Sequence, residues 1–524
     1  MFHFKFNNMK NITIIKSFCV TILLSGILGC SDTLKEEVET FYSAEQVFST
    51  KEGIETAVNG LYTTMSGYDY YGSGLIGLVY PISGRFYSNQ TASADATSLN
   101  CTPENIWLPK MWGQMYATIN VANNIIYNIE NNGVVLDNED FALAQARFIR
   151  GLTYFELVRL FGAVPLRTAP TTIANLHLAK SPKSVVYEQI ISDFQFAKLK
   201  LPEAGKYLSD RPLKWAAYGY LAKVYMTLAG EDGGDPSKWQ LANNEAIQMV
   251  GKYSLTTTYG ELFTVGIENT KESIFELQFS QIGATRTSDV VRMFTPSNST
   301  LAPPTSPTFG RIRPNKEVYD AHKNQYPGDP RIAATFIFDS YPRYPSGNQN
   351  IYPKQLTGNQ SFACIRKFLD PGYNGTTTSR NTIVFRYADV LLMLAEIENE
   401  LRGPAGAYQY VNLVLTRARN SVTPAAVQPA NWAGMDQAQF RTRIMKERQY
   451  ELLSEGHDWF DTRRRGYAYF KSEILDNHNN YAPNKTSGVD WIYPISEKNM
   501  LLPIPATELA GNQKLTAADQ NPGY

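Results

Sequence analysis

Carboxylates recur at helical spacing in the C-terminal third of the chain, in an arrangement that could do acid–base chemistry. Glu447, Glu451 and Glu455 lie one turn apart in KERQYELLSEGHDWFDTRRRG, which starts at Lys446. Two carboxylates that face one sugar are the catalytic pair of a glycoside hydrolase. The other carboxylates that could join such a pair are Glu396, Glu398, Glu400 and Asp461. A hydrolase is therefore one hypothesis that the sequence raises.

Arginines in neighbouring segments offer a second interpretation of these carboxylates. Like charges one turn apart on a helix repel one another by about a few tenths of a kcal/mol, so cations from other segments are expected to neutralise them. The candidate cations are Arg417, Arg419, Arg463 and Arg464. We favour this structural role, because ion pairing alone explains why carboxylates and arginines occur together here.

Both charged segments are predicted to be helices of a mostly α-helical chain. RYADVLLMLAEIENE, from Arg386, is apolar on nearly all faces, which is typical of a buried helix. Residues 105–253 read as a succession of helices that combine small and aromatic residues and are broken by Gly and Pro. Predicted helices start at Phe141, Val185, Pro212 and Trp239, and two more cover residues 384–401 and 409–420. Antiparallel pairs of such helices predict a tetratricopeptide-like scaffold.

Long irregular segments interrupt the predicted helices. They cover residues 66–108, 281–311 and 340–375 and are rich in Gly, Ser, Thr, Pro and Tyr. Only a few short strands are expected, at SIFELQFSQI from Ser273 and IAATFIF from Ile332. Irregular segments of this length in a compact protein are usually functional. We therefore expect the binding surface on these loops.

An ordered set of motifs extends over nearly the whole chain. MWGQMYATINVANNII starts at Met111, and AQARFIRGLTYFELVRLFGAVPL starts at Ala144. RPNKEVYDA, GDPR and RARN follow, and LLPIPATELAGNQKL and QNPGY close the chain at Tyr524. This set resembles the SusD/RagB family, the lipid-anchored nutrient-capture proteins of the Bacteroidetes outer membrane. The resemblance implies a SusD-like fold, with an N-terminal helical region over residues 30–270 and a C-terminal SusD/RagB region over residues 271–524 on the same scaffold.

The resemblance also implies a function. Members of the family bind an oligosaccharide or polysaccharide at the cell surface and deliver it, without catalysis, to a partner SusC-like TonB-dependent transporter. The RagB branch carries peptides in the same way, so a peptide cargo is an alternative. A scaffold that uses its helical repeats to bind proteins is another, and the glycoside hydrolase remains a third.

Glycan recognition needs flat aromatic faces for sugar rings and planar polar groups for hydroxyls. From the first loop we select Tyr70, Tyr71, Asn89, Asp95 and Trp107, and from the third loop Tyr341, Arg343, Tyr344 and Tyr352. Tyr68, Tyr80, Tyr87 and Gln90 belong to the same first loop. Trp107 is the first choice, because the family often places stacking aromatics there; its alternative is a core position beside Trp112. For the tyrosines of YPRYPSG the alternative is rigid loop packing.

The first residues read as a secretory signal. Lys10 and Lys16 precede an apolar run over residues 18–28, which is too short to span a bilayer and is followed by Cys30. We expect residues 1–29 to be a lipoprotein signal peptide and Cys30 to be the acylated N-terminus, which would anchor the protein in the outer membrane. In the family such proteins face the cell exterior. An ordinary signal cleaved elsewhere, and a start at Met9, are the alternatives.

Composition excludes several other functions. Lys plus Arg and Asp plus Glu each number 49, so the chain offers no basic field for nucleic acid. The five histidines are scattered without a paired ligand motif, so we predict no metal and no other cofactor. After Cys30 only Cys101 and Cys364 remain, and a bridge between them and two unlinked thiols are both open.

Overall fold

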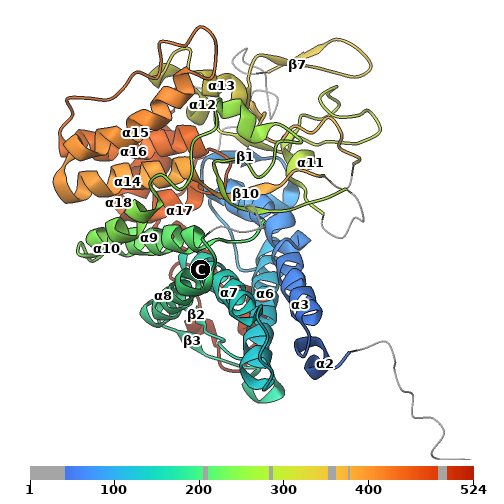
Figure 1. Ribbon diagram of the computed structural model, residues 1–524. Helices are drawn as coiled ribbons and strands as arrows, with labels where there is room; N and C mark the ends of the chain where they lie inside the picture. Colours follow the sequence, from blue (N-terminus) through green and yellow to red (C-terminus); the bar gives the residue numbers. More distant parts are fainter. Residues whose placement is uncertain (1–41, 204–209, 282–286, 352–361, 376–377, 482–491) are drawn as a thin grey trace, which may run out of the picture.

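The computed structural model describes residues 42–203, 210–281, 287–351, 362–375, 378–481 and 492–524. Helices dominate these residues, and the longer loops gather at one end of the molecule, in the upper right of Figure 1. The predicted fold class, a mostly α-helical scaffold of paired helices with long irregular loops and a few short strands, is confirmed.

The N-terminal half is a stack in which each long helix packs against the next. Its helices are α2 Ala44–Phe48, α3 Lys51–Met65, α6 Trp107–Asn131, α7 Glu139–Phe161, α8 Lys183–Lys200, α9 Lys214–Gly230 and α10 Lys238–Ala246. From α6 to α10 each helix contacts its successor, which is the predicted paired arrangement. The predicted end of α7 at Gly162 is confirmed, because this residue has a φ of 73°, a conformation that glycine adopts at little cost.

A second stack forms the C-terminal third. Its helices are α14 Tyr387–Arg402, α15 Pro404–Arg419 and α16 Gln437–Leu452, and α14 contacts both of the others. Helix α10 packs against α14, so the two stacks share one frame. The predicted helix start at residue 384 is wrong. Residues 382–386 form strand β10, since the run Thr-Ile-Val-Phe favours a strand before the helix begins at Tyr387.

Strands are short and pair only two by two among the described residues. The antiparallel pairs are β1 Phe86–Ser88 with β5 Ile312–Pro314, β2 Val164–Pro165 with β3 Lys180–Ser181, β4 Ser273–Leu277 with β10 Thr382–Arg386, β6 Phe336–Ile337 with β9 Cys364–Ile365, and β7 Ser340–Pro342 with β8 Asn348–Asn350. The strand predicted from Ser273 is confirmed as β4. The strand predicted from Ile332 is largely wrong, because Asp329 caps a short helix with Pro330 at its first position.

The predicted loops contain short helical turns. Within them lie η1 Tyr68–Gly72, η2 Leu75–Val79, α4 Tyr80–Ile82, α5 Ala94–Thr97 and α11 Val290–Phe294. The short helices outside the predicted loops are α12 Lys316–Gln325, α13 Pro330–Thr335, α17 Asp458–Arg463, α18 Gly466–Phe470, α19 Asn477–Asn480 and α20 Ala506–Gly511. The turns η1 and η2 bury most of their side chains against the helical stack, so a large part of the first loop belongs to the core.

Small residues allow close packing at the centre of the frame. A Cβ on Gly219 in α9 would lie 2.1 Å from Cε1 of Phe385 in β10, a distance that real atoms do not reach. Glycine is therefore required where the N-terminal stack meets the strand pair β4–β10. The neighbour that approaches this helix so closely is a strand rather than another helix.

Candidate ligand-binding face

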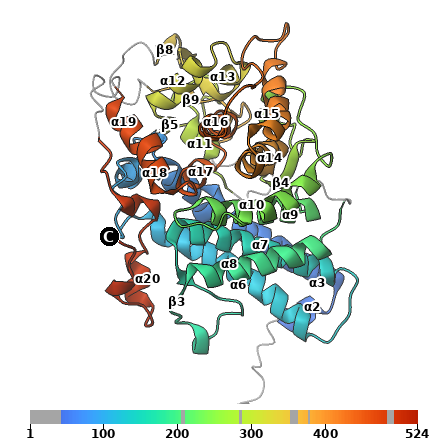
Figure 2. The same cartoon turned by 90° about the vertical axis from the view of Figure 1, so that its left-hand side faces the viewer.

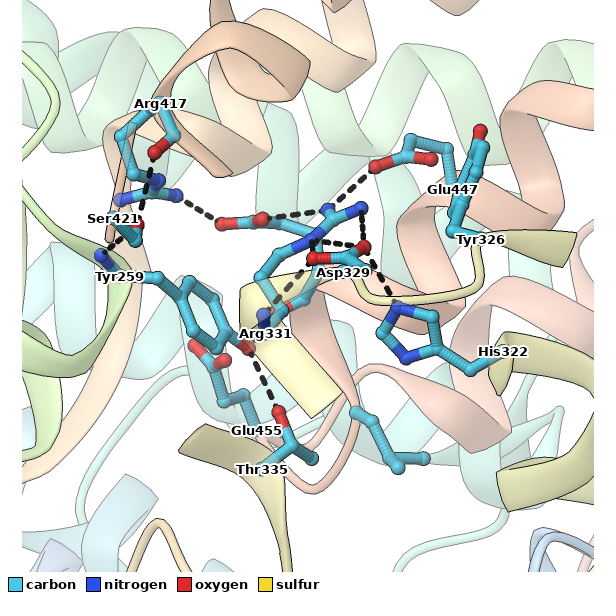
Figure 3. A network of polar contacts seen from close by, with 12 residues as sticks. Tyr259, His322, Tyr326, Asp329, Arg331, Thr335, Arg417, Ser421, Glu447 and Glu455 are labelled. Carbon is cyan, nitrogen blue, oxygen red and sulfur yellow. Dashed lines mark hydrogen bonds and ion pairs between the residues drawn. The ribbon is translucent and has the colours of Figure 1, made fainter. Parts of the chain in front are cut away.

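The carboxylates of α16 lie in a buried network of ion pairs (Figure 3). Arg331 of α13 donates to Glu447 at 2.6 Å and to Glu451 at 3.0 Å. Arg386 donates to Glu451 at 2.8 Å and to Glu455 at 2.6 Å. The other cations of the network are Arg417, which pairs with Glu451 and Glu272, and Lys367, which donates to Glu455 at 2.7 Å. Helix α16 ends at Leu452, so the expectation that Glu455 continues this helix is wrong. Cations from other segments nevertheless neutralise all three carboxylates, as predicted.

This environment does not suit acid catalysis. Burial raises the pKa of Glu451, but the charges of Arg417 and its neighbouring guanidinium groups prevail and lower the pKa to about 2. A general acid needs a pKa near the working pH. Glu396 is likewise paired, since both of its oxygens accept from Arg464 at 2.7 Å. The structural interpretation of these carboxylates is therefore favoured over a hydrolase pair.

The predicted cation partners are partly confirmed. Arg417 neutralises the α16 carboxylates as expected. Arg464 instead pairs with Glu396 and Asp461. Arg419 donates to the carbonyl of Pro429 and to the side-chain oxygens of Thr416 and Asn431. Arg463 donates mainly to backbone carbonyl oxygens.

Several aromatic rings selected from the sequence lie in the core. Tyr70 and Tyr71 both donate their hydroxyl groups to the carboxylate of Glu156 in α7, each at 2.5 Å. Trp107, at the start of α6, is 5% exposed and packs against Gly77, where a Cβ would lie 2.6 Å from the indole ring. These rings offer no open face to a ligand. Trp107 is therefore a core residue, which was the alternative to its predicted role in binding. Burying a large ring stabilises the fold more than exposing it.

The selected residues of the third loop are divided between core and surface. Tyr341 of β7 is buried. Arg343 donates to the side-chain oxygen of Gln349 at 2.9 Å across the β7–β8 hairpin, and Tyr344 is 37% exposed beside it. Tyr352 lies outside the described residues, as does Cys30.

The two selected polar residues of the first loop differ in whether their side chains are free to contact a ligand. Asp95 accepts hydrogen bonds from the side chain of Asn105 at 2.6 Å and from the backbone of Thr102 at 3.3 Å, so its carboxylate organises the loop itself. Asn89 is exposed, and its backbone N–H donates to the carbonyl of Arg311 at 3.2 Å. This contact continues the β1–β5 ladder and joins the first loop to the second.

A group of exposed and half-buried residues with rings and guanidinium groups forms where these two loops meet. We call it the loop face, and it consists of Tyr68, Asn89, Arg292, Phe309 and Arg311. Tyr68 is 39% exposed, and its hydroxyl donates to Asp289 at 2.7 Å. Burial of part of the ring raises the pKa of Tyr68, which keeps this hydroxyl protonated.

The guanidinium groups of the loop face are held in fixed positions. Arg292 pairs with Asp289, and its guanidinium carbon lies 5.4 Å from the ring centroid of Phe309. The guanidinium carbon of Arg311 lies 4.4 Å from the same centroid. Arg311 has no carboxylate within ion-pair distance among the residues that the structure describes. Its donors therefore remain available to a ligand.

Sequence reasoning missed Arg292, Phe309 and Arg311, although it placed all three in or beside a functional loop. Their convergence depends on the β1–β5 pairing, which joins residues 86–88 to residues 312–314. No local pattern indicates a pairing over such a separation. The only signal was the length of the irregular segment itself.

Comparison with known proteins agrees with this architecture. A family model described as "SusD family" matches residues 271–524, and one described as "Starch-binding associating with outer membrane" matches residues 35–226. The SusD-like protein P2 of Formosa agariphila is 30% identical over 527 residues, which covers 96% of this chain and 98% of that protein. This chain belongs to the SusD family. The resemblance seen in the ordered motifs is confirmed.

Solved SusD-family structures share the fold. A SusD homologue from Bacteroides thetaiotaomicron has a TM-score of 0.78 at 23% identity and covers 93% of this chain and 100% of its own. A laminarin-binding SusD-like protein has a TM-score of 0.69 at 22% identity, and the match covers 91% of this chain and 100% of that protein. A structure with xylogluco-oligosaccharide has a TM-score of 0.71 at 21% identity, and the match covers 88% of this chain and 97% of that protein.

Three further properties concern only the part of this SusD-family chain that the structure describes. No group of three His, Cys, Asp or Glu side chains there is arranged to hold a metal ion. None of its helices combines the length and apolar character needed to cross a bilayer. Cys101 and Cys364 are both buried free thiols.

Proposed function

We propose that this SusD-family protein is a non-catalytic glycan-binding protein, which holds an oligosaccharide or polysaccharide on the loop face. The observation that carries the proposal is the loop face itself. The exposed ring of Tyr68 is a flat surface for the apolar side of a sugar, and Arg292 and Arg311 supply planar donors for its hydroxyls. Tyr344 and Asn89 extend the same chemistry along the loops.

The names of related proteins support a carbohydrate ligand. One structural neighbour binds laminarin, another was solved with xylogluco-oligosaccharide, and the matching N-terminal model is described as starch-binding. None of these names mentions a peptide. A carbohydrate is therefore the cargo we infer here, in preference to the peptide of the RagB branch.

The location we propose follows from the signal sequence and from the family. Acylation of Cys30 would anchor the protein in the outer membrane, with residues 1–29 removed and the loop face toward the cell exterior. The description of the N-terminal model, which names association with the outer membrane, supports this location. Delivery of the glycan to a SusC-like TonB-dependent transporter then requires a second face of the helical frame for that partner.

A glycan array with the soluble chain that starts after Cys30 tests the proposed binding. Arg311→Ala and Tyr68→Ala should weaken binding of the best glycan by about tenfold or more, as the loss of a central contact does in other interfaces. Tyr127→Ala is the matched control, because Tyr127 is an exposed tyrosine of α6 outside the loop face, 53% exposed. Equal binding by all variants, or release of reducing sugar by the wild type, would refute the proposal.

A further inference from the structure

A cavity that shares no residue with the loop face is built from other elements of the fold. Its volume is about 330 Å³, and it opens where α7, α8 and α9 meet α17 and residues 497–501. Figure 2 shows α17, α18 and α20 together along one side of the stack that includes α6, α7 and α8. The floor is buried and includes Tyr187 and Trp459, whereas Asp232 and Glu497 are exposed at the rim. We call this cavity the C-terminal cleft.

A guanidinium without a counter-ion lines the C-terminal cleft. The guanidinium carbon of Arg159 lies 3.6 Å from the ring centroid of Phe155 and 3.7 Å from that of Phe460, so both of its flat faces are covered. Its Nε–H donates to the carbonyl of Phe155 at 2.8 Å. Across the described part of the chain, no carboxylate pairs with Arg159 and no acceptor bonds its two terminal nitrogens.

The carboxylate next to Arg159 in sequence is already engaged elsewhere. Glu156 lies one turn earlier in α7 and accepts from the hydroxyl groups of Tyr70 and Tyr71. Arg159 is half-buried in the cavity wall, and its terminal nitrogens have no protein acceptor among the described residues. Arg159 therefore has the character of a binding residue rather than of a structural ion pair.

A tyrosine hydroxyl without a protein partner lines the same cleft. Tyr187 of α8 is only 3% exposed, and its hydroxyl makes no hydrogen bond to any described residue. The hydroxyl is therefore available to a ligand in the cavity. Burial lowers the pKa of Arg159, and the charge of Glu156 and, less strongly, Tyr187 from the neighbouring helix oppose this shift.

The other charged groups of the cleft are mostly satisfied within the protein. Lys183 pairs with Glu231 at 2.8 Å, and Lys498 donates to Asn100 at 2.7 Å. Arg463 donates to backbone carbonyls, and Arg464 pairs with two carboxylates. The cations outnumber the carboxylates, because the lining contains Arg159, Lys183, Arg463, Arg464 and Lys498 against Glu231, Asp232 and Glu497. The field in the cleft thus favours an anion.

We propose that the C-terminal cleft is a second ligand site, which binds an organic acid of about monosaccharide size through its carboxylate or sulfate group. The oxyanion accepts hydrogen bonds from the terminal nitrogens of Arg159 and from the hydroxyl of Tyr187. Trp459, Phe460 and Tyr467 supply the apolar wall beside it. A cavity of this volume suits a ligand of that size. This site is independent of the loop face and of the glycan proposed to bind there.

Calorimetric titration of the soluble chain at low ionic strength tests the second site. The probes are D-glucuronate, D-glucose 6-sulfate and D-glucose. We expect at least one of the two acids to bind and glucose not to bind, with the binding acid showing whether the site takes a carboxylate or a sulfate. Arg159→Gln should weaken that binding by about tenfold or more, because charge-assisted hydrogen bonds are the strong ones.

Two conservative variants keep the test decisive if Arg159→Gln impairs folding. Tyr187→Phe removes only the unpartnered hydroxyl and should weaken binding by about threefold to tenfold. Tyr253→Phe is the matched control, because the Tyr253 hydroxyl is also without a partner among the described residues but lies outside the cleft. Arg311→Ala on the loop face should leave acid binding unchanged. Failure of both acids to bind, or equal binding by wild type and Tyr187→Phe, would overturn the second site without affecting the loop face.

Discussion

Arg150 and Asp193 form a two-pronged ion pair between α7 and α8. The Nε and Nη2 of Arg150 donate to the two oxygens of Asp193 at 2.8 and 2.7 Å, and both side chains are buried. The remaining donor, Nη1, bonds the side-chain oxygen of Asn123 in α6 at 2.7 Å. Three successive helices of the N-terminal stack are thus joined by one guanidinium.

Arg150→Met should therefore destabilise the protein strongly. It leaves the Asp193 carboxylate buried without its cation, and removal of one partner of a buried pair costs about 3–5 kcal/mol. The free energy of unfolding in urea measures the change. Lys51→Ala is the control, because Lys51 pairs with Asp137 at an exposed position and should change the free energy by less than about 1 kcal/mol. Similar effects of the two substitutions would contradict the role given to Arg150.

His457 makes stability depend on pH. Burial lowers the pKa of its imidazole from 6.5 to about 4 in the folded protein, although Asp389 lies 3.8 Å away and opposes the shift. The unfolded chain then takes up a proton at a higher pH than the folded chain does. The contribution of neutral His457 to the free energy of unfolding therefore has its full value above pH 6.5. It is lost as the pH is lowered toward 4, by up to about 3 kcal/mol.

Replacing His457 should flatten this part of the pH profile. His457→Gln keeps a polar side chain but cannot take up the proton. Urea unfolding at a series of pH values across the window measures the slope for both proteins. If wild type and variant lose stability in parallel as the pH falls, another group is responsible.

Gly219→Ala should weaken the join between α9 and β10. The added methyl would meet the Phe385 ring at 2.1 Å, and overpacking of this kind costs about 1–3 kcal/mol, more than the helix propensity gained. Gly113→Ala in α6 is the matched control, since nothing lies within 4 Å of its added Cβ. The control should be neutral or stabilising by up to about 1 kcal/mol. Thermal unfolding of the two variants would show opposite shifts.

Cys30→Ser should release the protein from the membrane fraction. The proposed anchor is lipid on this cysteine, and each buried methylene contributes about 0.8 kcal/mol to membrane binding. Labelling with radioactive palmitate and fractionation of cells measure the loss. A variant that remains labelled and sediments with the membrane would contradict lipidation at Cys30.

The helical frame could be predicted from sequence because its signals are local. The stop of α7 at Gly162 and the small residues around Gly219 act within a few residues of their own positions. The two errors also have local causes. At Ile332 a capped helix formed in place of the predicted strand, and at residue 384 a β-branched run formed a strand in place of the predicted helix start.

The site was harder to predict, because burial decides which of several similar residues faces outward. Tyr68, Tyr70 and Tyr71 have the same chemistry within four positions, yet only Tyr68 is exposed, and the short helical turn η1 directs the other two to Glu156. Arg331, Arg386 and Lys367, three of the cations that neutralise the glutamates of this segment, were missed for a related reason. Arg331 and Glu447 are 116 residues apart in sequence, so their pairing exists only in the folded chain.

The two sides of the buried ion network are translated at different times. Glu447, Glu451 and Glu455 arrive near the end of translation, after the cations that they neutralise. A polypeptide that terminates before α16 would carry Arg331, Lys367, Arg386 and Arg417 into its interior with only Glu272 and Asp329 to balance them. We therefore expect such a truncated product to be strongly destabilised in its C-terminal half and accessible to proteases.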